Sequence, residues 1–304
     1  MIKSVTIIND KNEQIQMILT NPETSEFAIE SIGGLEPEKA DISSNELVSS
    51  DGSTFTNSRK QTKQITFDLI FCPNDYNIER VRHKCYSFFP VKKKIKMIFE
   101  TDERNAWIEG VVESNTPSIF SEREGTQISV ICMDPWFKNI NEHKYTIVGV
   151  LDRFEFPFSN ESLSENLTEI SSDNYGDNIN IVNIGESEVG LILEITFDSG
   201  CDELSFYNLT TNKNMIILGK PPGTGRHQIE EGDTLIISTI SGNKKIELYT
   251  KDGDCYRYTS ALSKNENGRY DFPTLIEGLN VIGIETDGVV SKAFVKAQYL
   301  YGGI

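Results

Sequence analysis

The sequence has no apolar run near the roughly 18 residues that a membrane-spanning helix requires. Its beginning, Met1-Ile2-Lys3-Ser4-Val5-Thr6, lacks the apolar core and the small-residue cleavage site of a signal peptide. We therefore expect the chain to be made and folded in a cytoplasm.

Cysteine is scarce, and no two cysteines have the spacing of zinc ligands or of a disulfide framework. The five are scattered along the chain: Cys72, Cys85, Cys132, Cys201 and Cys255. Because free cysteine is among the most buried residue types, we expect all five to be small buried apolar residues.

Positive charge is also scarce: 29 Lys and Arg stand against 46 Asp and Glu, for a net charge of −17. Affinity for a nucleic-acid backbone comes from Lys and Arg, so this chain is a poor candidate for gripping DNA, and its acidity is expected to serve solubility. The only basic run is Lys92-Lys93-Lys94 with Lys96. We expect these lysines to mark a solvated or edge strand that is guarded against wrong pairing, while contacts with DNA, an acidic partner or an acidic neighbouring copy are the alternatives.

Motifs for catalysis or metal binding are missing as well. The three histidines, His83, His143 and His227, share no spacing, and no nucleophile elbow is present. The carboxylate pairs Glu230-Glu231 and Asp252/Asp254 are attributed to turns. No catalytic, cofactor-binding or metal-binding residue is predicted, no cofactor is expected, and the chain is not expected to be an enzyme.

Residues 220–227, Lys-Pro-Pro-Gly-Thr-Gly-Arg-His, look superficially like a phosphate-binding loop. That motif requires glycine at its first position, then lysine and a hydroxyl residue at its end. Here those positions hold Lys220, Arg226 and His227, and no helical pattern follows. We predict a loop that joins two strands.

What the sequence does contain is strand patterning. Residues 127–137 begin as a strand with two mostly apolar rows, which predicts burial on both faces. Asp134-Pro135 ends it, and Trp136 and Phe137 are expected to plug the end of a core. The composition changes from Ile140, so we predict an N-terminal domain over 1–140.

The same domain shows further strand patterns at 4–19 (a hairpin), 27–32, 63–71, 92–99 and 106–113. One helix is predicted, capped by Asn74 or Asp75, with apolar positions Ile78, Val81, Cys85 and Phe88, and ended by Pro90. Residues 36–61 are polar and rich in breakers, which predicts a loop or protruding hairpin with an intermolecular role.

Residues 141–180 are expected to be a linker or solvated excursion, because 159–177 are dense in Ser, Asn, Glu and Asp. Residues 181–304 are predicted to form a β-sandwich, with strands at 190–197, 204–209, 214–218, 234–239, 245–250, 280–285 and 291–299. The aromatic residues Phe206, Tyr207, Tyr249, Tyr256 and Tyr258 could stack on sugars, but alternation favours a place in the core.

The order of these motifs resembles the distal tail protein of siphophages. The resemblance rests on the strand that closes with Cys132-x-Asp134-Pro135-Trp136, the helix with Arg80 and Arg82, and three later stretches at 231–246, 273–280 and 299–302. Residues 159–177 match no motif of the family. The resemblance implies a mainly β chain: an N-terminal β-sandwich or split-barrel ring domain with one helix, then a galectin-like sandwich over 181–304.

The resemblance further implies a structural virion protein at the tail tip, without catalysis. Copies would form a hexameric ring that joins the major tail tube protein and the tape measure protein to a tail-associated fibre or lysin hub of the baseplate. Receptor-binding proteins are further candidate partners, and DNA would only pass through the lumen, kept from adhering by acidic residues. A carbohydrate-binding sandwich for host adhesion is the alternative, and a glycosidase with two facing carboxylates is a third reading.

Overall fold

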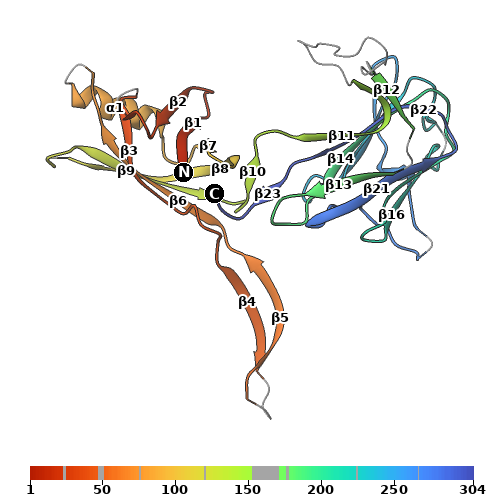
Figure 1. Cartoon of the computed structure of the whole chain (residues 1–304), viewed down its shortest axis with the longest axis horizontal. Helices are drawn as coiled ribbons and strands as arrows, with labels where there is room; N and C mark the ends of the chain where they lie inside the picture. Colours follow the sequence, from red (N-terminus) through yellow and green to blue (C-terminus); the bar gives the residue numbers. More distant parts are fainter. Residues whose placement is uncertain are drawn as a thin grey trace, which may run out of the picture. The chain divides into compact units, whose positions relative to one another are not determined.

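The computed structural model describes residues 1–22, 25–46, 51–74, 77–119, 121–152, 171–175, 178–223, 225–265 and 267–304. The chain divides into two compact units: unit 1, Met1–Ile140 with Leu300–Ile304, and unit 2, Asn141–Tyr299. Strands dominate both units (Figure 1), so the predicted mainly β fold is confirmed.

Unit 1 is built on one antiparallel sheet. Its main strands are β1 (Ile2–Ile8), β2 (Gln14–Ile18), β3 (Phe27–Gly33), β6 (Lys63–Phe71), β7 (Lys94–Thr101), β8 (Asn105–Ser118) and β9 (Gly125–Cys132). They lie in the order β2-β1-β7-β8-β9-β6-β3. The edge strands β2 and β3 approach each other, so the sheet curls toward a barrel around its core.

The core of unit 1 follows from alternation along these strands. In β6 the side chains of Ile65, Phe67 and Leu69 are buried, while the residues between them are at least partly exposed. The ring of Phe67 lies parallel to that of Phe99 on β7, with centroids 6.3 Å apart. Burying each such side chain stabilises the fold by roughly 1.5–3 kcal/mol.

Strand β9 differs from its prediction on one face. Ile128, Val130 and Cys132 are fully buried, as expected, but Met133 is 69% exposed and Ile131 is only partly covered. The prediction of burial on both faces was therefore wrong, because the one buried residue of the outer row, Ser129, is held by hydrogen bonds with Gln64 and Glu113 and the row ends in the exposed Met133. Phe137 fills the end of the core, as predicted: its side chain is fully buried, and its ring packs edge to face against that of Phe99.

The predicted helix is α1 (Ile78–Phe88), and it is the one α-helix among the described residues. Its side-chain cap is Asn77, which accepts a hydrogen bond from the Arg80 N–H at 3.0 Å. The prediction of Asn74 or Asp75 was wrong on this point, and residue 75 itself lies outside the described residues. Val81, Cys85 and Phe88 are buried, as their spacing predicted.

Residues 36–61 contain a hairpin of β4 (Ala40–Glu46) and β5 (Ser53–Lys60), which confirms the hairpin alternative. These two strands pair only with each other, as a separate two-stranded sheet. Nearly every residue in them is exposed, so neither face is covered by the rest of the described chain.

Unit 2 is a β-sandwich, as predicted. One sheet has the order β12-β11-β22-β14-β17-β18-β19, and the other has the order β13-β21-β15-β16-β20. The strands of the first are β11 (His143–Asp152), β12 (Ser171–Tyr175), β14 (Leu191–Phe197), β17 (Thr234–Ser238), β18 (Lys245–Tyr249), β19 (Cys255–Arg257) and β22 (Val290–Ala297). Those of the second are β13 (Asn178–Asn183), β15 (Glu203–Asn208), β16 (Lys213–Leu218), β20 (Leu262–Ser263) and β21 (Gly278–Thr286).

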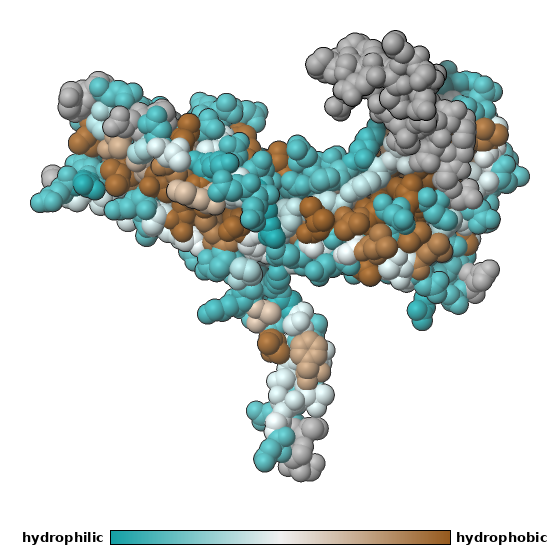
Figure 2. Space-filling model, viewed as in Figure 1, coloured by the Kyte–Doolittle hydropathy of each residue, from teal (hydrophilic) through white to brown (hydrophobic). Residues whose placement is uncertain are grey.

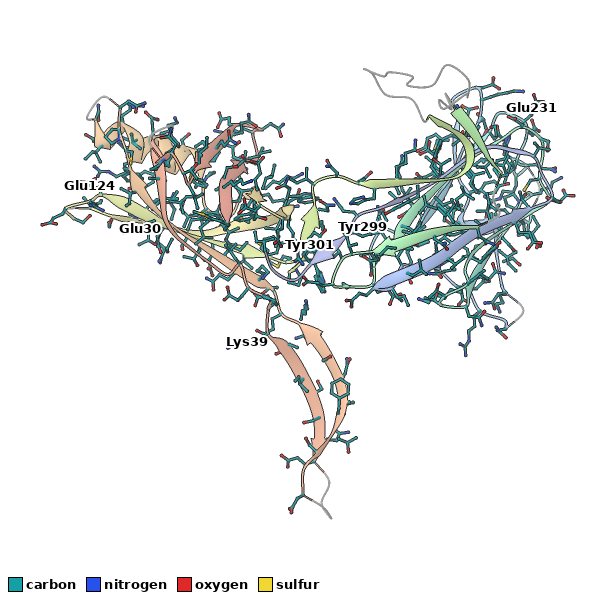
Figure 3. The ribbon with its side chains drawn as sticks, viewed as in Figure 1. Glu30, Lys39, Glu124, Glu231, Tyr299 and Tyr301 are labelled. Atoms are coloured by element: carbon teal, nitrogen blue, oxygen red, sulfur yellow. The ribbon has the colours of Figure 1, made fainter. Side chains whose placement is uncertain are left out.

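Two segments differ from the domain division expected from the sequence. The expected linker over 141–180 contains β11, β12 and the start of β13, while residues 153–170 lie outside the described part. At the other end, Leu300–Ile304 belong to unit 1, where β23 (Leu300–Tyr301) pairs with β10 (Phe137–Asn139). Arg104 holds this end, with its guanidinium 4.7 Å from the centroid of the Tyr301 ring (Figure 3).

Candidate interaction surfaces

The β4–β5 hairpin carries two large apolar side chains in solvent. Ile42 is 69% exposed and Phe55 is 63% exposed. Phe55 pairs with Ser44, which is two residues from Ile42, so both apolar side chains lie on one face of the hairpin. Figure 2 shows hydrophobic colouring midway along this otherwise hydrophilic to neutral hairpin. Such a patch on a protruding element is typical of a contact surface.

The base of the hairpin is fixed by a buried lysine. The Lys63 side chain is fully buried, and its Nζ donates to the Glu36 carbonyl at 2.6 Å and lies 3.4 Å from the Glu38 carboxylate. A buried ammonium is stable only when it is paired in this way. This role of Lys63 was not predicted from the sequence, although Lys63 stands in the same inward row as Ile65 and Phe67, which was the available signal.

The outer face of unit 1 carries a surface that we call the basic-aromatic face, made by Trp107, Met133 and Trp136 with Lys60, Lys96 and Lys138. Three ammonium groups lie over its indole rings: Lys60 Nζ is 3.4 Å from the Trp136 centroid, and Lys96 and Lys138 Nζ are 4.0 and 5.1 Å from that of Trp107. Each such contact is worth about 0.5–1 kcal/mol at an exposed site.

A hollow of about 190 Å³ adjoins these rings and is lined by Lys94 and Met133 among others. Lys94 and Lys96 come from the basic run, which we expected on a solvated or edge strand. The edge alternative was wrong, because β7 lies between β1 and β8 inside the sheet, whereas Lys92, Lys93 and Lys94 are exposed to solvent. Together with Lys60 and Lys138, Lys94 and Lys96 give this face four lysines against the two carboxylates of Glu109 and Asp134, so this part of an acidic chain is locally basic.

The cysteines do not form a common site. Cys85, Cys132 and Cys201 are buried, and burial raises the pKa of the Cys85 thiol to about 11 and that of Cys132 to about 12. The expectation of burial was wrong for Cys255, which is exposed, and Cys72 is only partly covered. All five are free thiols.

The three histidines lie in separate places. His83 is on α1 beside Glu79, the ring centroid of His143 on β11 lies 4.6 Å from that of Tyr299 with the rings tilted by 32°, and His227 Nε2 lies 3.0 Å from Asp233 Oδ2. Within the described ranges, no group of three or more His, Cys, Asp or Glu is placed to hold a metal ion. No helix of the described chain is long and apolar enough to cross a membrane.

The described residues of the 220–227 stretch form a loop between β16 and β17, as predicted, and no helix follows them. Tyr258 pins this loop, since its buried hydroxyl donates to the carbonyls of Gly219 and His227. Burial raises the pKa of the Tyr258 phenol, so it remains a hydrogen-bond donor. The loop is thus held as part of the sandwich.

The carboxylates that the sequence singled out lie at turns. Asp254 and Gly253 close the β18–β19 turn by donating backbone N–H groups to Thr250. Glu230 donates its N–H to Asp233 Oδ2 ahead of β17, and Glu231 lies beside it in the same turn (Figure 3). Among the predicted aromatic core residues, Phe206 and Tyr258 are buried, but Tyr249 and Tyr256 are exposed, so the core prediction was wrong for those two.

Comparison with known proteins identifies the class of this fold. Residues 10–134, which make up most of unit 1, match the family model of the phage tail protein RIFT-related domain. Among curated proteins, no sequence is significantly similar to the chain.

Solved structures show that the fold of the chain is known. The SPP1 Dit (gp 19.1) protein, described as a paradigm of the hub adsorption apparatus in phages that infect Gram-positive bacteria, has the same fold, with a TM-score of 0.65, 12% identity, and coverage of 97% of this chain and 98% of that chain. Two structures of the phage P2 baseplate in its activated conformation, with Ca and with Sr, match with TM-scores of 0.47 and 0.43, identities of 11% and 10%, and coverage of 98% and 97% of both chains. The predicted resemblance to a siphophage distal tail protein is confirmed.

Proposed function

We propose that the protein is the distal tail hub of a virion, in which six copies close into a ring at the tail tip. The ring would join the tail tube and tape measure proteins to the fibre or lysin proteins of the baseplate, with DNA only passing through its lumen. The observation that carries this proposal is the fold shared with a hub protein over 97% of the chain. We propose no catalytic role.

A ring needs head-to-tail contacts between two different surfaces of each copy. Unit 1 offers two surfaces of the required kind: the hairpin with Ile42 and Phe55, and the basic-aromatic face. Copies with a net charge of −17 repel one another, so a locally basic surface is where an acidic neighbour binds at the lowest electrostatic cost. We assign both surfaces to contacts between copies.

The solution mass of the full chain tests the hub proposal. Native mass spectrometry should find a species of six times the 34.3 kDa chain. Both tryptophans of the chain lie on the basic-aromatic face, so their emission should shift to shorter wavelength as copies assemble. A monomer that persists at the highest soluble concentration, with unchanged emission, contradicts the proposal.

A charge-reversal pair tests the interface assignment. Lys96→Glu with Lys138→Glu should shift assembly to at least tenfold higher concentration, because like charges then face each other. Lys292→Glu in unit 2 is the control, since it makes the same kind of charge change at an exposed lysine. If the control variant loses assembly as strongly as the pair, total charge rather than this face governs the ring.

A further inference from the structure

Unit 2 has two adjoining hollows that share one side chain, Lys213. The first, of about 370 Å³, is lined by Tyr207, Asn214 and Glu285 among others. The second, of about 440 Å³, is lined by Glu188 and Tyr270 among others. Each volume lies in the range of about 300–1,000 Å³ that is usual for sites that bind small ligands.

Each hollow has an aromatic wall. Tyr207 on β15 pairs with Asn214 on β16 and with Gly283 on β21, and the glycine has no side chain to cover that flank of the ring. In the second hollow Tyr270 is 53% exposed, and Lys244 Nζ lies 4.3 Å from the centroid of the Phe272 ring. Rings with an apolar face and a polar edge suit ligands whose own rings are apolar on one face and hydroxylated at the rim.

The polar side chains supply both donors and acceptors. In the second hollow the Ser241 hydroxyl and the Lys244 ammonium can donate to a ligand. Asp271 Oδ2 accepts from Asn265 at 2.7 Å, and no other described side chain donates to this carboxylate. In the first hollow Asn214 Oδ1 has no hydrogen-bond partner in the described chain, so turning this amide oxygen toward a ligand breaks no hydrogen bond.

The charges of the two hollows nearly balance. Their lining includes the ammonium groups of Lys213 and Lys244 and the carboxylates of Glu188, Asp271 and Glu285. A polyanion needs a clear surplus of cations, which this lining does not supply. A neutral polyhydroxylated ligand can instead donate to the carboxylates and accept from the ammonium groups.

The ionisation of Glu188 suits a site that binds a glycan rather than one that cleaves a glycosidic bond. The Thr274 hydroxyl and the Lys213 ammonium, which lies 2.9 Å away, hold the pKa of this carboxyl below its usual range. A glycosidase requires one carboxylic acid whose pKa is raised, so that it can donate a proton to the leaving group. Glu188 remains ionised at neutral pH and serves as an acceptor.

We propose that the two hollows form one groove for a neutral polysaccharide of hexose or N-acetylhexosamine units. One sugar ring lies on Tyr207 and another on Tyr270 and Phe272, with Lys213 between them. A tail-tip protein with such a groove contacts the bacterial surface directly. This binding belongs to unit 2 and does not depend on ring closure.

The test applies the full chain to an array of neutral hexose and N-acetylhexosamine oligosaccharides, with sulfated and phosphorylated glycans on the same array. The strongest neutral oligosaccharide is then titrated by calorimetry. Tyr270→Ala should weaken its binding about tenfold, since one aromatic stacking contact is worth about 1.4 kcal/mol. Glu285→Ala, in the other hollow, should weaken long oligosaccharides more than disaccharides.

The matched control is Tyr249→Ala, which removes a similarly exposed tyrosine outside both hollows and should leave binding unchanged. Both Tyr270 and Tyr249 are exposed, so thermal unfolding of the three variants should match that of the parent chain. Three outcomes would each overturn the proposed groove. The chain could bind no neutral glycan at millimolar concentration, it could bind polyanions alone, or the Tyr249 variant could lose as much glycan affinity as the Tyr270 variant. Native mass of the same samples reports ring assembly separately.

Discussion

At the scale of single residues, Glu26 fixes the helix of unit 1 to its sheet. This carboxylate directly precedes β3 and accepts hydrogen bonds from Arg80 and Lys84, which are four residues apart on one face of α1. The two cations hold the pKa of Glu26 below its ordinary value of 4.5. The folded state therefore favours the ionised form, and this contribution to stability depends on pH.

Glu26→Gln should lower the free energy of unfolding by about 1–2 kcal/mol at pH 7, because two charge-assisted hydrogen bonds are weakened. The native pKa is depressed, so the carboxylate stabilises the fold fully above the unfolded pKa near 4.5 and less as the pH falls through the lower native pKa. Urea unfolding of both chains at a series of pH values should give free energies of unfolding that differ at pH 7 and converge below pH 4.5. Glu30→Gln, at an exposed glutamate of β3 (Figure 3), should change neither the free energy of unfolding at pH 7 nor its dependence on pH.

Cysteine reactivity should follow burial. At pH 8 a thiol with a pKa of about 11 is ionised in roughly one molecule in a thousand, so Cys85 and Cys132 should resist iodoacetamide in the folded chain. Cys255 is exposed and should be alkylated first. Peptide mass spectrometry with and without urea measures this order. Labelling of Cys85 as fast as Cys255 in native buffer would show that α1 opens readily.

At the scale of elements, regular alternation in the sequence predicted individual strands well, but it did not predict which strands are neighbours in a sheet. The patterns at 63–71 and 190–197 became β6 and β14 almost residue for residue, because one buried face dictates an apolar residue at every second position. The burial of Lys63 was missed and the position of Lys96 in the sheet was misread, since both depend on partners distant in sequence. Strands β10 and β23 have three and two residues, too few to show a period.

The candidate surfaces were predictable to different degrees. The polar stretch at 36–61 indicated an intermolecular arm, but the exposure of Ile42 and Phe55 on one face became visible only with the register of β4 and β5. The sequence also predicted a loop between two strands at 220–227, and the described residues of that stretch form one between β16 and β17. The two hollows of unit 2 were not predicted, since Lys213 and Tyr270 are brought together by the sandwich.

The hairpin should be dispensable for folding and necessary for assembly. Ile42→Ser with Phe55→Ser should leave the unfolding free energy within about 0.5 kcal/mol, because both side chains are exposed in the single chain. Burying them against a neighbour contributes roughly 1.5–3 kcal/mol each, so the variant should need at least tenfold higher concentration to assemble. Sedimentation velocity measures this shift.

Ser44→Ala with Ser58→Ala is the control for that experiment, because these serines pair with Phe55 and Ile42 across the same hairpin. The control should assemble like the parent chain. Equal assembly of all three chains would remove the hairpin from the interface and leave the basic-aromatic face as the surface to examine.

At the scale of the whole molecule, the net charge of −17 determines how the proposed ring would interact with DNA in its lumen. Phosphate binding is driven by Lys and Arg that displace counterions, and it strengthens as salt falls. We therefore expect the assembled protein not to retard a short DNA duplex in a gel, even at about 50 mM salt, where non-specific binding is strong. Acidic residues along the lumen would repel the duplex and let it slide.

The basic-aromatic face is the part of unit 1 where DNA could still bind, because its lysines are at least partly exposed to solvent unless a neighbouring copy covers them. In a closed ring its lysines would be covered by the neighbouring copy, whereas in separate copies they would be open to DNA. The Ile42→Ser/Phe55→Ser chain, held below its assembly concentration, should therefore bind the duplex more strongly than the parent ring, and Lys96→Glu with Lys138→Glu should remove that binding. Retardation by the intact ring, stronger at low salt, would place Lys and Arg in the channel and refute the acidic lumen.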